Sequence, residues 1–156
     1  MPSLAAFTSG RGRIQNWGVL APDVEAVAEA LKTRDAIRLQ ASGAYAANLL
    51  GLSDQVPMRI VYLTDGRTRR LKIGNLQILL RRTTPRNMAT AETISGLVIQ
   101  ALRWLGRHGD YKPIVRQLRK RLSANDKRRL AADAHYAPEW VAQIMRKIAH
   151  DEEPEN

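Results

Sequence analysis

The stretch from Val56 to Asn87 constrains the fold most, because it contains three short β-type runs separated by turn signals. The first run, Ile60 to Leu63, stops at Thr64-Asp65-Gly66, and Asp-Gly is among the strongest short turn signals. Beyond it, apolar residues alternate with basic or polar ones on both sides of a second turn at Gly74-Asn75. The stretch therefore predicts a basic β-meander.

The alternation also predicts how this meander presents its side chains. A period of two places Leu71 and Ile73 on one face of the sheet, and Arg70 and Lys72 on the other. An antiparallel sheet can pack one face on a core while the other meets a partner. We therefore expect one sheet to serve both purposes.

Apolar residues recur at helical spacing on both sides of the meander. The spacing predicts helices at residues 22–33, 44–50, 90–105, 112–122, 123–134 and 138–148, and one further short strand at 35–40. Ser42-Gly43 is a candidate helix cap, Gly51 a candidate helix stop, and Ser123 with Asp126 fits a capping box. Because strands cluster in the middle and helices in the C-terminal half, the predicted class is α+β, with a small, mostly antiparallel sheet and five or six helices.

The length of 156 residues suits one domain with a real core and is short for two. We predict a flexible basic arm at residues 1–16, a single domain at 17–150 and a disordered acidic tail at 151–156. No apolar run approaches the roughly 18 residues that a membrane helix needs, and the N-terminus lacks the pattern of a secretory signal. The predicted location is the cytoplasm, with no membrane partner.

The positive charge is concentrated in one part of the chain. The formal net charge is +10, and Met58 to Arg129 carries 18 Lys and Arg residues against four acidic ones. Such an excess favours an acidic partner: nucleic acid, an anionic membrane face or an acidic protein surface.

Two clusters of basic residues are candidates for a surface that binds nucleic acid or a protein partner. The meander carries Arg67, Arg69, Arg70, Lys72, Arg81, Arg82 and Arg86, and the helices carry Arg116, Arg119, Lys120, Arg128 and Arg129. The fork of arginine suits both phosphates and carboxylates. The alternative is that these side chains are only the solvated faces of amphipathic elements.

Catalytic and cofactor patterns are weak in this sequence. Cysteine is absent, the three histidines lack ligand spacing, and neither a P-loop nor a G-x-G-x-x-G loop occurs. Asp23, Glu25 and Glu29 share a helix, where first-turn acids usually stabilise the helix end, and Tyr62, Trp104 and Trp140 fall in apolar stripes that predict core positions. The prediction is a protein that is not an enzyme and has no metal or cofactor. A nuclease-like enzyme would need clustered carboxylates.

Several short pieces of the sequence carry a family resemblance. They are Ser42-Gly43-Ala44, Ala47-Asn48, Leu50-Gly51-Leu52, Gln55-Val56-Pro57, Tyr62-Leu63-Thr64-Asp65-Gly66, Arg69-Arg70 and Thr84-Pro85-Arg86, with a looser match through Leu97 to Gly106 and Ala137-Pro138-Glu139-Trp140. With these pieces the chain resembles the AbiEi-type antitoxins of bacterial type IV toxin–antitoxin systems, and more closely an uncharacterised AbiEi-like branch.

The resemblance implies an antitoxin that opposes a nucleotidyltransferase-like toxin and often represses its own operon. In the family a winged helix-turn-helix usually precedes the antitoxin domain, whereas only a short Gly/Arg arm precedes Trp17 here, so we expect that segment to be lacking. Two hypotheses follow. One is a non-enzymatic antitoxin that meets its toxin through the basic surface, and the other is a nucleic-acid-binding regulator that uses the same residues, with Arg11 and Arg13 as an arm.

Overall fold

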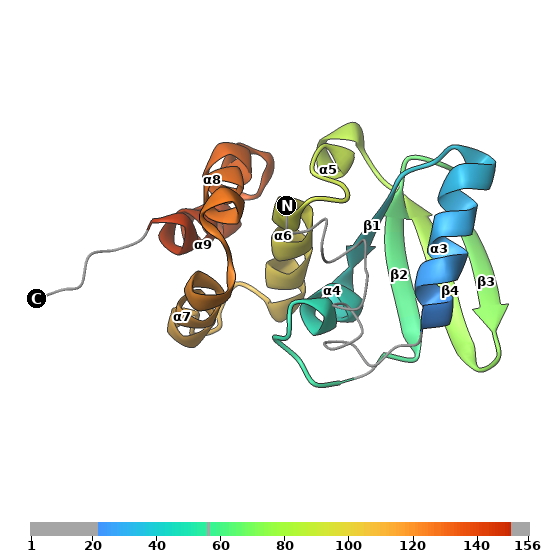
Figure 1. The fold of residues 1–156 in the computed structure, drawn as a ribbon, viewed down its shortest axis with the longest axis horizontal. Helices are drawn as coiled ribbons and strands as arrows, with labels where there is room; N and C mark the ends of the chain where they lie inside the picture. The colour runs from blue at the N-terminus through green and yellow to red at the C-terminus, as the bar shows by residue number, and fades with distance from the viewer. Residues whose placement is uncertain (1–21, 56, 151–156) are drawn as a thin grey trace, which may run out of the picture.

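The computed structural model describes residues 22–55 and 57–150, which contain seven α-helices, one 3₁₀ helix and a four-stranded sheet (Figure 1). The predictions for the basic arm at 1–16 and the acidic tail at 151–156 lie outside these residues. In chain order the elements are α3 (Pro22–Asp35), β1 (Leu39–Ser42), α4 (Gly43–Leu49), β2 (Arg59–Thr64), β3 (Arg69–Ile73), β4 (Leu76–Arg82), α5 (Pro85–Met88), α6 (Ile94–Leu105), α7 (Lys112–Arg121), α8 (Ala124–Asp133), η1 (Ala134–Tyr136) and α9 (Glu139–Ala149).

The class is α+β, as predicted, but the predicted meander is wrong. The strand order is β1-β2-β4-β3, so β4 lies between β2 and β3 and runs parallel to β2. The other two pairs, β1 with β2 and β3 with β4, are antiparallel. The apolar content of the strands explains why β4 rather than β3 lies beside β2. Ile78 and Leu80 of β4 are 2% and 0% exposed, whereas β3 carries charged residues suited to the edge of a sheet.

The loop at Asp65-Gly66 therefore does not close a hairpin between neighbouring strands. It is held from the side of α3 and β1 instead. The Asp65 carboxylate accepts a hydrogen bond from the Arg38 backbone N–H at 2.9 Å, and Thr64 Oγ1 accepts one from the Gly66 N–H at 3.0 Å. These contacts let the chain cross from β2 to the far edge of the sheet.

The strand predicted at 35–40 is displaced to Leu39–Ser42, because α3 continues to Asp35. Ala36 adopts a left-handed conformation with φ of 54°, and the Ile37 N–H donates to the Lys32 carbonyl. This pairing is the Schellman arrangement that ends a helix, here without glycine.

The predicted helix stop at Gly51 is confirmed. Gly51 has φ of 77°, and the N–H groups of Gly51 and Leu52 donate to the carbonyls of Asn48 and Ala47, which is again the Schellman arrangement. The predicted cap at Ser42 has the right position, but its side chain makes no capping hydrogen bond.

The other helix boundaries were predicted with mixed success. Ser123 and Asp126 form the predicted capping box of α8. α6 begins at Ile94 rather than Thr90, because Thr93 caps it and Glu92, with φ of 63°, lies outside the helix. The turn predicted after β4 contains the short helix α5, capped by Thr84.

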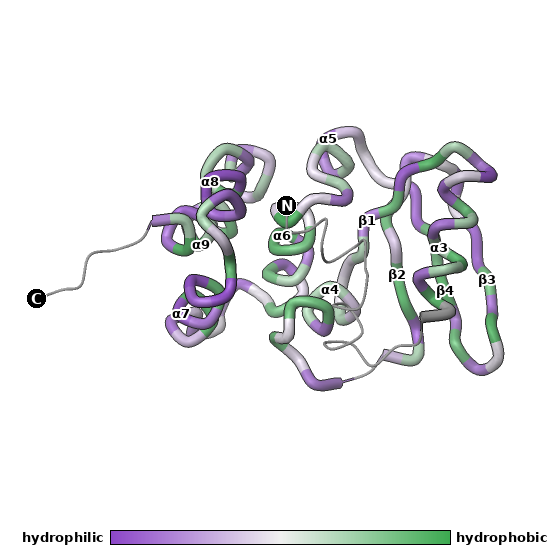
Figure 2. The backbone as a smooth tube through the Cα atoms, viewed as in Figure 1, coloured by the Kyte–Doolittle hydropathy of each residue, from purple (hydrophilic) through white to green (hydrophobic). Residues whose placement is uncertain are grey.

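One hydrophobic core extends from Val24 in α3 to Ile148 in α9 and includes residues of the sheet. α6 joins the sheet, with α4, to the C-terminal helices. It contacts β1 and α4 on one side and α8 and α9 on the other (Figure 1). In Figure 2, α7 and α8 carry the purple of hydrophilic residues, which matches their position at the outer end of the molecule. The core prediction is confirmed for Tyr62 but wrong for Trp104, which is 44% exposed.

Within the described residues, no helix has the length and apolar character that crossing a bilayer requires.

Gly96 in α6 provides a test of how tightly the sheet and helices are joined. A Cβ atom at this position would lie 2.3 Å from both Gln40 Oε1 and the Thr90 carbonyl oxygen. We expect Gly96→Ala to lower the free energy of unfolding by about 1–3 kcal/mol, because overpacking outweighs the better helix propensity of alanine. Chemical denaturation would measure this. The control Gly109→Ala, whose nearest neighbour is 3.7 Å away, should change stability by no more than about 0.5 kcal/mol.

Candidate functional site

The strand register divides the predicted basic residues of the sheet between its two faces. Arg69 is aligned with Leu80, and Leu80 with Tyr62, so these three side chains lie on the face covered by α3. Arg70 is aligned with Leu79, and Leu79 with Val61, so these lie on the opposite face. Adjacent positions along β3 therefore have different surroundings.

Arg69 is part of the packing between the sheet and α3. Its Nη1 lies 2.7 Å from Asp35 Oδ2, and both side chains are about one quarter exposed, at 26% and 28%. The hydrogen bond from Arg34, together with that from Arg69, lowers the pKa of the Asp35 carboxyl. Arg67 and Arg82 are exposed near this end of β3 and β4.

The opposite face carries four exposed cations arranged around an aliphatic centre. We call it the basic sheet face, and it consists of Arg59, Arg70, Lys72 and Arg81 with Val61, Gln77 and Leu79. Lys72, Gln77 and Arg59 form one cross-strand row, and Arg70, Leu79 and Val61 form the next. Strand spacing separates the outer members of a row by about 10 Å.

The basic sheet face has no internal compensation for its charge. Register places no acidic and no aromatic residue on this side of the four strands. Its four cations make no hydrogen bond or ion pair with another residue in the described part of the chain. Like charges on neighbouring strands repel, so this arrangement costs stability unless a partner supplies negative charge.

On this side of the sheet Gln40 and Ser42 of β1 are buried and α6 contacts that strand, so described helices cover the area next to the basic sheet face. Leu63 of β2 packs there with Met88 and Ala91, at and beyond the end of α5. Arg86 of α5 is directed elsewhere, since its Nη2 donates to the His135 carbonyl at 2.6 Å. Within the described part of the chain, the residues of the basic sheet face itself are exposed or, for Val61 and Leu79, half-buried.

Two arginines of α7, Arg119 of the predicted cluster and its neighbour Arg121, hold separate elements of the fold together. Arg119 donates through Nε and Nη2 to the Lys147 carbonyl at 3.0 and 2.7 Å, near the end of α9. Arg121, from the same helix, donates to the Leu50 carbonyl at 2.7 Å, and Gly51 leaves room for its guanidinium. Cations at helix C-termini are stabilising. Sequence alone cannot distinguish arginines that bond to the carbonyls of other helices from arginines that bind a partner.

Arg128 and Arg129 also have local partners within α8. Arg128 donates to Asn125, and Arg129 Nε lies 2.8 Å from Asp133 Oδ2 one turn away. The predicted residues Arg116 and Lys120 of α7 are exposed and make no such contact with another described residue. Arg116 borders a groove between α7 and α9, which Tyr111 and Lys147 also line.

Sequence reasoning missed Arg59 as a site residue. Arg59 precedes the apolar run of β2. It is two residues before Val61, and residues two apart on a strand share a face, which was the available signal for its position. The signal could not be used without knowing that β4 is the neighbour of β2, because a meander would have placed β3 there.

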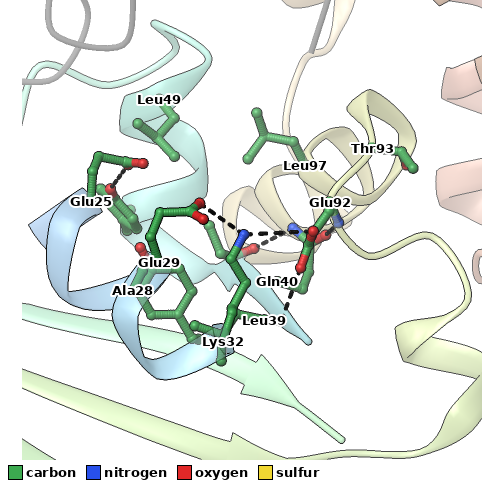
Figure 3. A pocket seen from close by; sticks show the side chains of 13 residues that line it. Glu25, Ala28, Glu29, Lys32, Leu39, Gln40, Leu49, Glu92, Thr93 and Leu97 are labelled. Atoms are coloured by element: carbon green, nitrogen blue, oxygen red, sulfur yellow. Dashed lines mark hydrogen bonds and ion pairs between the residues drawn. The ribbon is translucent and has the colours of Figure 1, made fainter. Parts of the chain in front are cut away.

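A second feature is a small pocket on the face of the sheet that α3 covers (Figure 3). It holds about 80 Å³ and has aliphatic walls from Leu39, Leu49 and Leu97. Tyr45 and Tyr62 lie against it with their rings edge to face at 5.8 Å. The polar lining consists of Glu25, Glu29, Lys32, Gln40, Glu92 and Thr93.

The acidic side chains of this pocket differ in their partners. Lys32 Nζ lies 2.9 Å from Glu29 Oε2 and 3.6 Å from Glu92 Oε1. The Tyr45 hydroxyl donates to Glu25 Oε2 at 3.1 Å. Burial, with a smaller contribution from Glu29, raises the pKa of the Glu25 carboxyl above its usual value, against the opposing effects of Tyr45 and Lys32.

Within the described residues, no group of three or more His, Cys, Asp or Glu side chains is placed to hold a metal ion.

Comparison with protein families gives one match, to a family model that covers residues 11–130. The chain belongs to DUF6088, a family of unknown function. The matched range includes the whole sheet, both the basic sheet face and the acidic pocket, and ends within α8 of this DUF6088 chain. No curated protein and no solved structure matches the chain significantly.

The raised pKa of Glu25 predicts a pH-dependent effect on stability. The folded state binds this proton more tightly than the unfolded chain, so ionising Glu25 costs stability. The cost is absent below the unfolded pKa near 4.5 and is complete above the raised folded pKa. We therefore expect Glu25→Gln to raise Tm at pH 7 and to leave it unchanged at pH 4.

Thermal unfolding of both proteins across this pH range would test the effect. Glu29, Lys32, Tyr45 and Tyr62 face Glu25 and are kept in both proteins. Glu139→Gln is the charge-matched control; because this exposed carboxylate, in the first turn of α9, lies 3.6 Å from Arg146, its loss should not raise Tm at pH 7. A Tm difference for Glu25→Gln that is equal at both pH values would contradict the assignment.

Proposed function

We propose that this protein is a non-enzymatic, antitoxin-type binding module that engages an acidic partner through the basic sheet face. The partner is a nucleotidyltransferase-like toxin, as the resemblance to AbiEi-type antitoxins implies. The observation that carries the proposal is the group of four exposed, uncompensated cations on one face of the sheet. The family match to DUF6088 is compatible with this role and names no activity.

The chemistry of this face favours a folded acidic protein. Its centre is aliphatic, with Val61 and Leu79 half-buried, and its rim is cationic. Protein interfaces combine an apolar centre with a polar rim. Arginine is preferred at such surfaces because its fork binds carboxylates at two points.

The same face is poorly suited to single-stranded nucleic acid. Such partners are usually held by aromatic side chains on which bases stack, in addition to cations along the backbone. The register places no aromatic residue there, and Tyr62 faces the core on the other side. A duplex backbone, which needs only cations, is the nucleic-acid partner that remains compatible.

A capture experiment with matched variants tests the proposal. Tagged wild-type protein and Arg70→Glu/Lys72→Glu are expressed in the native host, and nuclease-treated lysates are analysed by mass spectrometry. We expect wild type to capture a nucleotidyltransferase-like protein. The variant should capture about tenfold less of that protein, because two attractive charges become repulsive. Arg69 is left intact because its ion pair with Asp35 supports the fold.

The control is Arg116→Glu/Lys120→Glu, which makes the same change of charge on α7 and should capture the toxin as wild type does. If both variants lose it equally, the net charge rather than the basic sheet face determines binding. If nuclease removes everything that wild type captures, the antitoxin proposal fails for this chain.

A nucleic-acid-binding regulator is the second candidate, favoured by the exposed cations of α7 and its groove with α9. Binding to a phosphate backbone releases counterions, so the affinity for duplex DNA should fall steeply and linearly on a log–log plot against salt concentration. A shallow slope would argue against this candidate.

A further inference from the structure

The pocket beside α3 has an electrostatic character opposite to that of the rest of the chain. Three glutamates and one lysine line it, in a protein whose formal net charge is +10. The lining comes from α3, β1, α4, β2 and the residues around the start of α6 (Figure 3). The basic sheet face lies on the other side of the sheet, because Leu39, Ala41 and Tyr62 of the pocket alternate with residues of that face.

Two of the three glutamates are already engaged by the fold. Glu92 receives Lys32 on one oxygen and the Leu39 N–H, at 3.4 Å, on the other, while its own N–H donates to Gln40. Glu29 takes the closer contact with Lys32. These contacts tie α3 to β1 and to the segment before α6, which explains them without a ligand.

Glu25 is the exception. The structure gives this half-buried carboxylate one hydrogen-bond donor, the Tyr45 hydroxyl on Oε2, and no ion pair with another described residue. Its other oxygen, Oε1, has no donor among the described residues. Lys32 acts on this carboxylate only from a distance, without an ion pair, so part of the cost of burying it remains, and a cationic ligand in direct contact would lower that cost.

We propose that this pocket is a binding site for a primary alkylammonium group, whose ammonium pairs with Glu25 while its methylene chain lies against the leucines of the wall. An ammonium is a compact charge with rotatable donors, which suits a carboxylate with one oxygen already occupied. The volume of about 80 Å³ and the aliphatic walls admit a short methylene chain. The group can come from a small free amine or from a lysine side chain of another molecule.

The test is an NMR titration of the intact protein with n-butylammonium chloride, with 1-butanol as the uncharged probe of the same length. We expect butylammonium to shift the amide signals of Ala28, Ala41 and Leu97, which line the pocket from three elements. Butanol should bind about tenfold more weakly, because it lacks the charge-assisted hydrogen bond to Glu25.

Two variants connect the binding to this site. Glu25→Gln keeps an acceptor for Tyr45 but removes the charge, and should weaken butylammonium binding about tenfold or more. Glu139→Gln removes the same charge on α9, far along the chain, and should leave binding unchanged. Ala28→Leu, at a position 7% exposed in the pocket wall, adds volume and should abolish binding with the charge intact.

The outcomes distinguish the proposal from its alternatives. No butylammonium-induced shift at these amides, equal binding of butanol, or equal binding by Glu25→Gln would each overturn it. Two further probes then distinguish the sources of the ammonium group. Tighter binding of putrescine indicates a small free amine, and tighter binding of Nα-acetyl-lysine methylamide indicates a lysine side chain of another molecule. The result is independent of the capture experiment, because the pocket and the basic sheet face share no residue.

Discussion

The central place of β4 is the constraint on which both surfaces of the sheet depend. Parallel pairing of β4 with β2 aligns Ile60 with Ile78 and Tyr62 with Leu80 and thereby produces one continuous apolar layer under α3. The same pairing aligns Val61 with Leu79 on the reverse side and brings Arg59 into the row of Gln77 and Lys72. Had β3 been the neighbour of β2, Arg59 would have joined a different set of side chains. A period-two pattern determines which residues share a face of one strand, and the strand order determines which strands combine.

Arginine serves two purposes in this chain, and the difference lies in what the guanidinium reaches. Arg119 and Arg121 lie on α7 and donate to carbonyls of α9 and of the residue that ends α4, so each neutralises the negative end of another helix. Arg69 pairs with Asp35 and holds α3 to the edge strand. Arg70 is one residue from Arg69, yet it points to the open side, where no described carbonyl or carboxylate receives it. A cluster of basic residues in the sequence is therefore a mixture, and only tertiary contacts separate its members.

The sequence predicted the elements well and their arrangement partly. Local signals succeeded where the physics is local: Gly51 ended α4, Ser123 with Asp126 capped α8, and alternation placed Arg70 and Lys72 together. Prediction failed where contacts between segments distant in the sequence determine the structure. Asp65-Gly66 carries a hairpin signal, but its hydrogen bonds join it to Arg38 and Thr64, and the more apolar β4 takes the central position. The acidic pocket could not be predicted either, because its polar lining comes from segments as far apart as Glu25 and Glu92.

The opposite charges on the two sides of the sheet follow from what each side must neutralise. On the α3 side, Lys32 satisfies Glu29 and Glu92, and the Glu92 carboxylate also accepts the N–H of Leu39 at the start of β1. Those acids are therefore needed to attach α3 and β1 to the segment before α6, and they remain compensated in the absence of a partner. Glu25 has no such role beyond its hydrogen bond with Tyr45, and the cations of the basic sheet face have none among the described residues. In both places the described residues supply no ion pair for these charges. Residues of this kind, rather than the most highly charged segments of the chain, are the ones that binding to another molecule best explains.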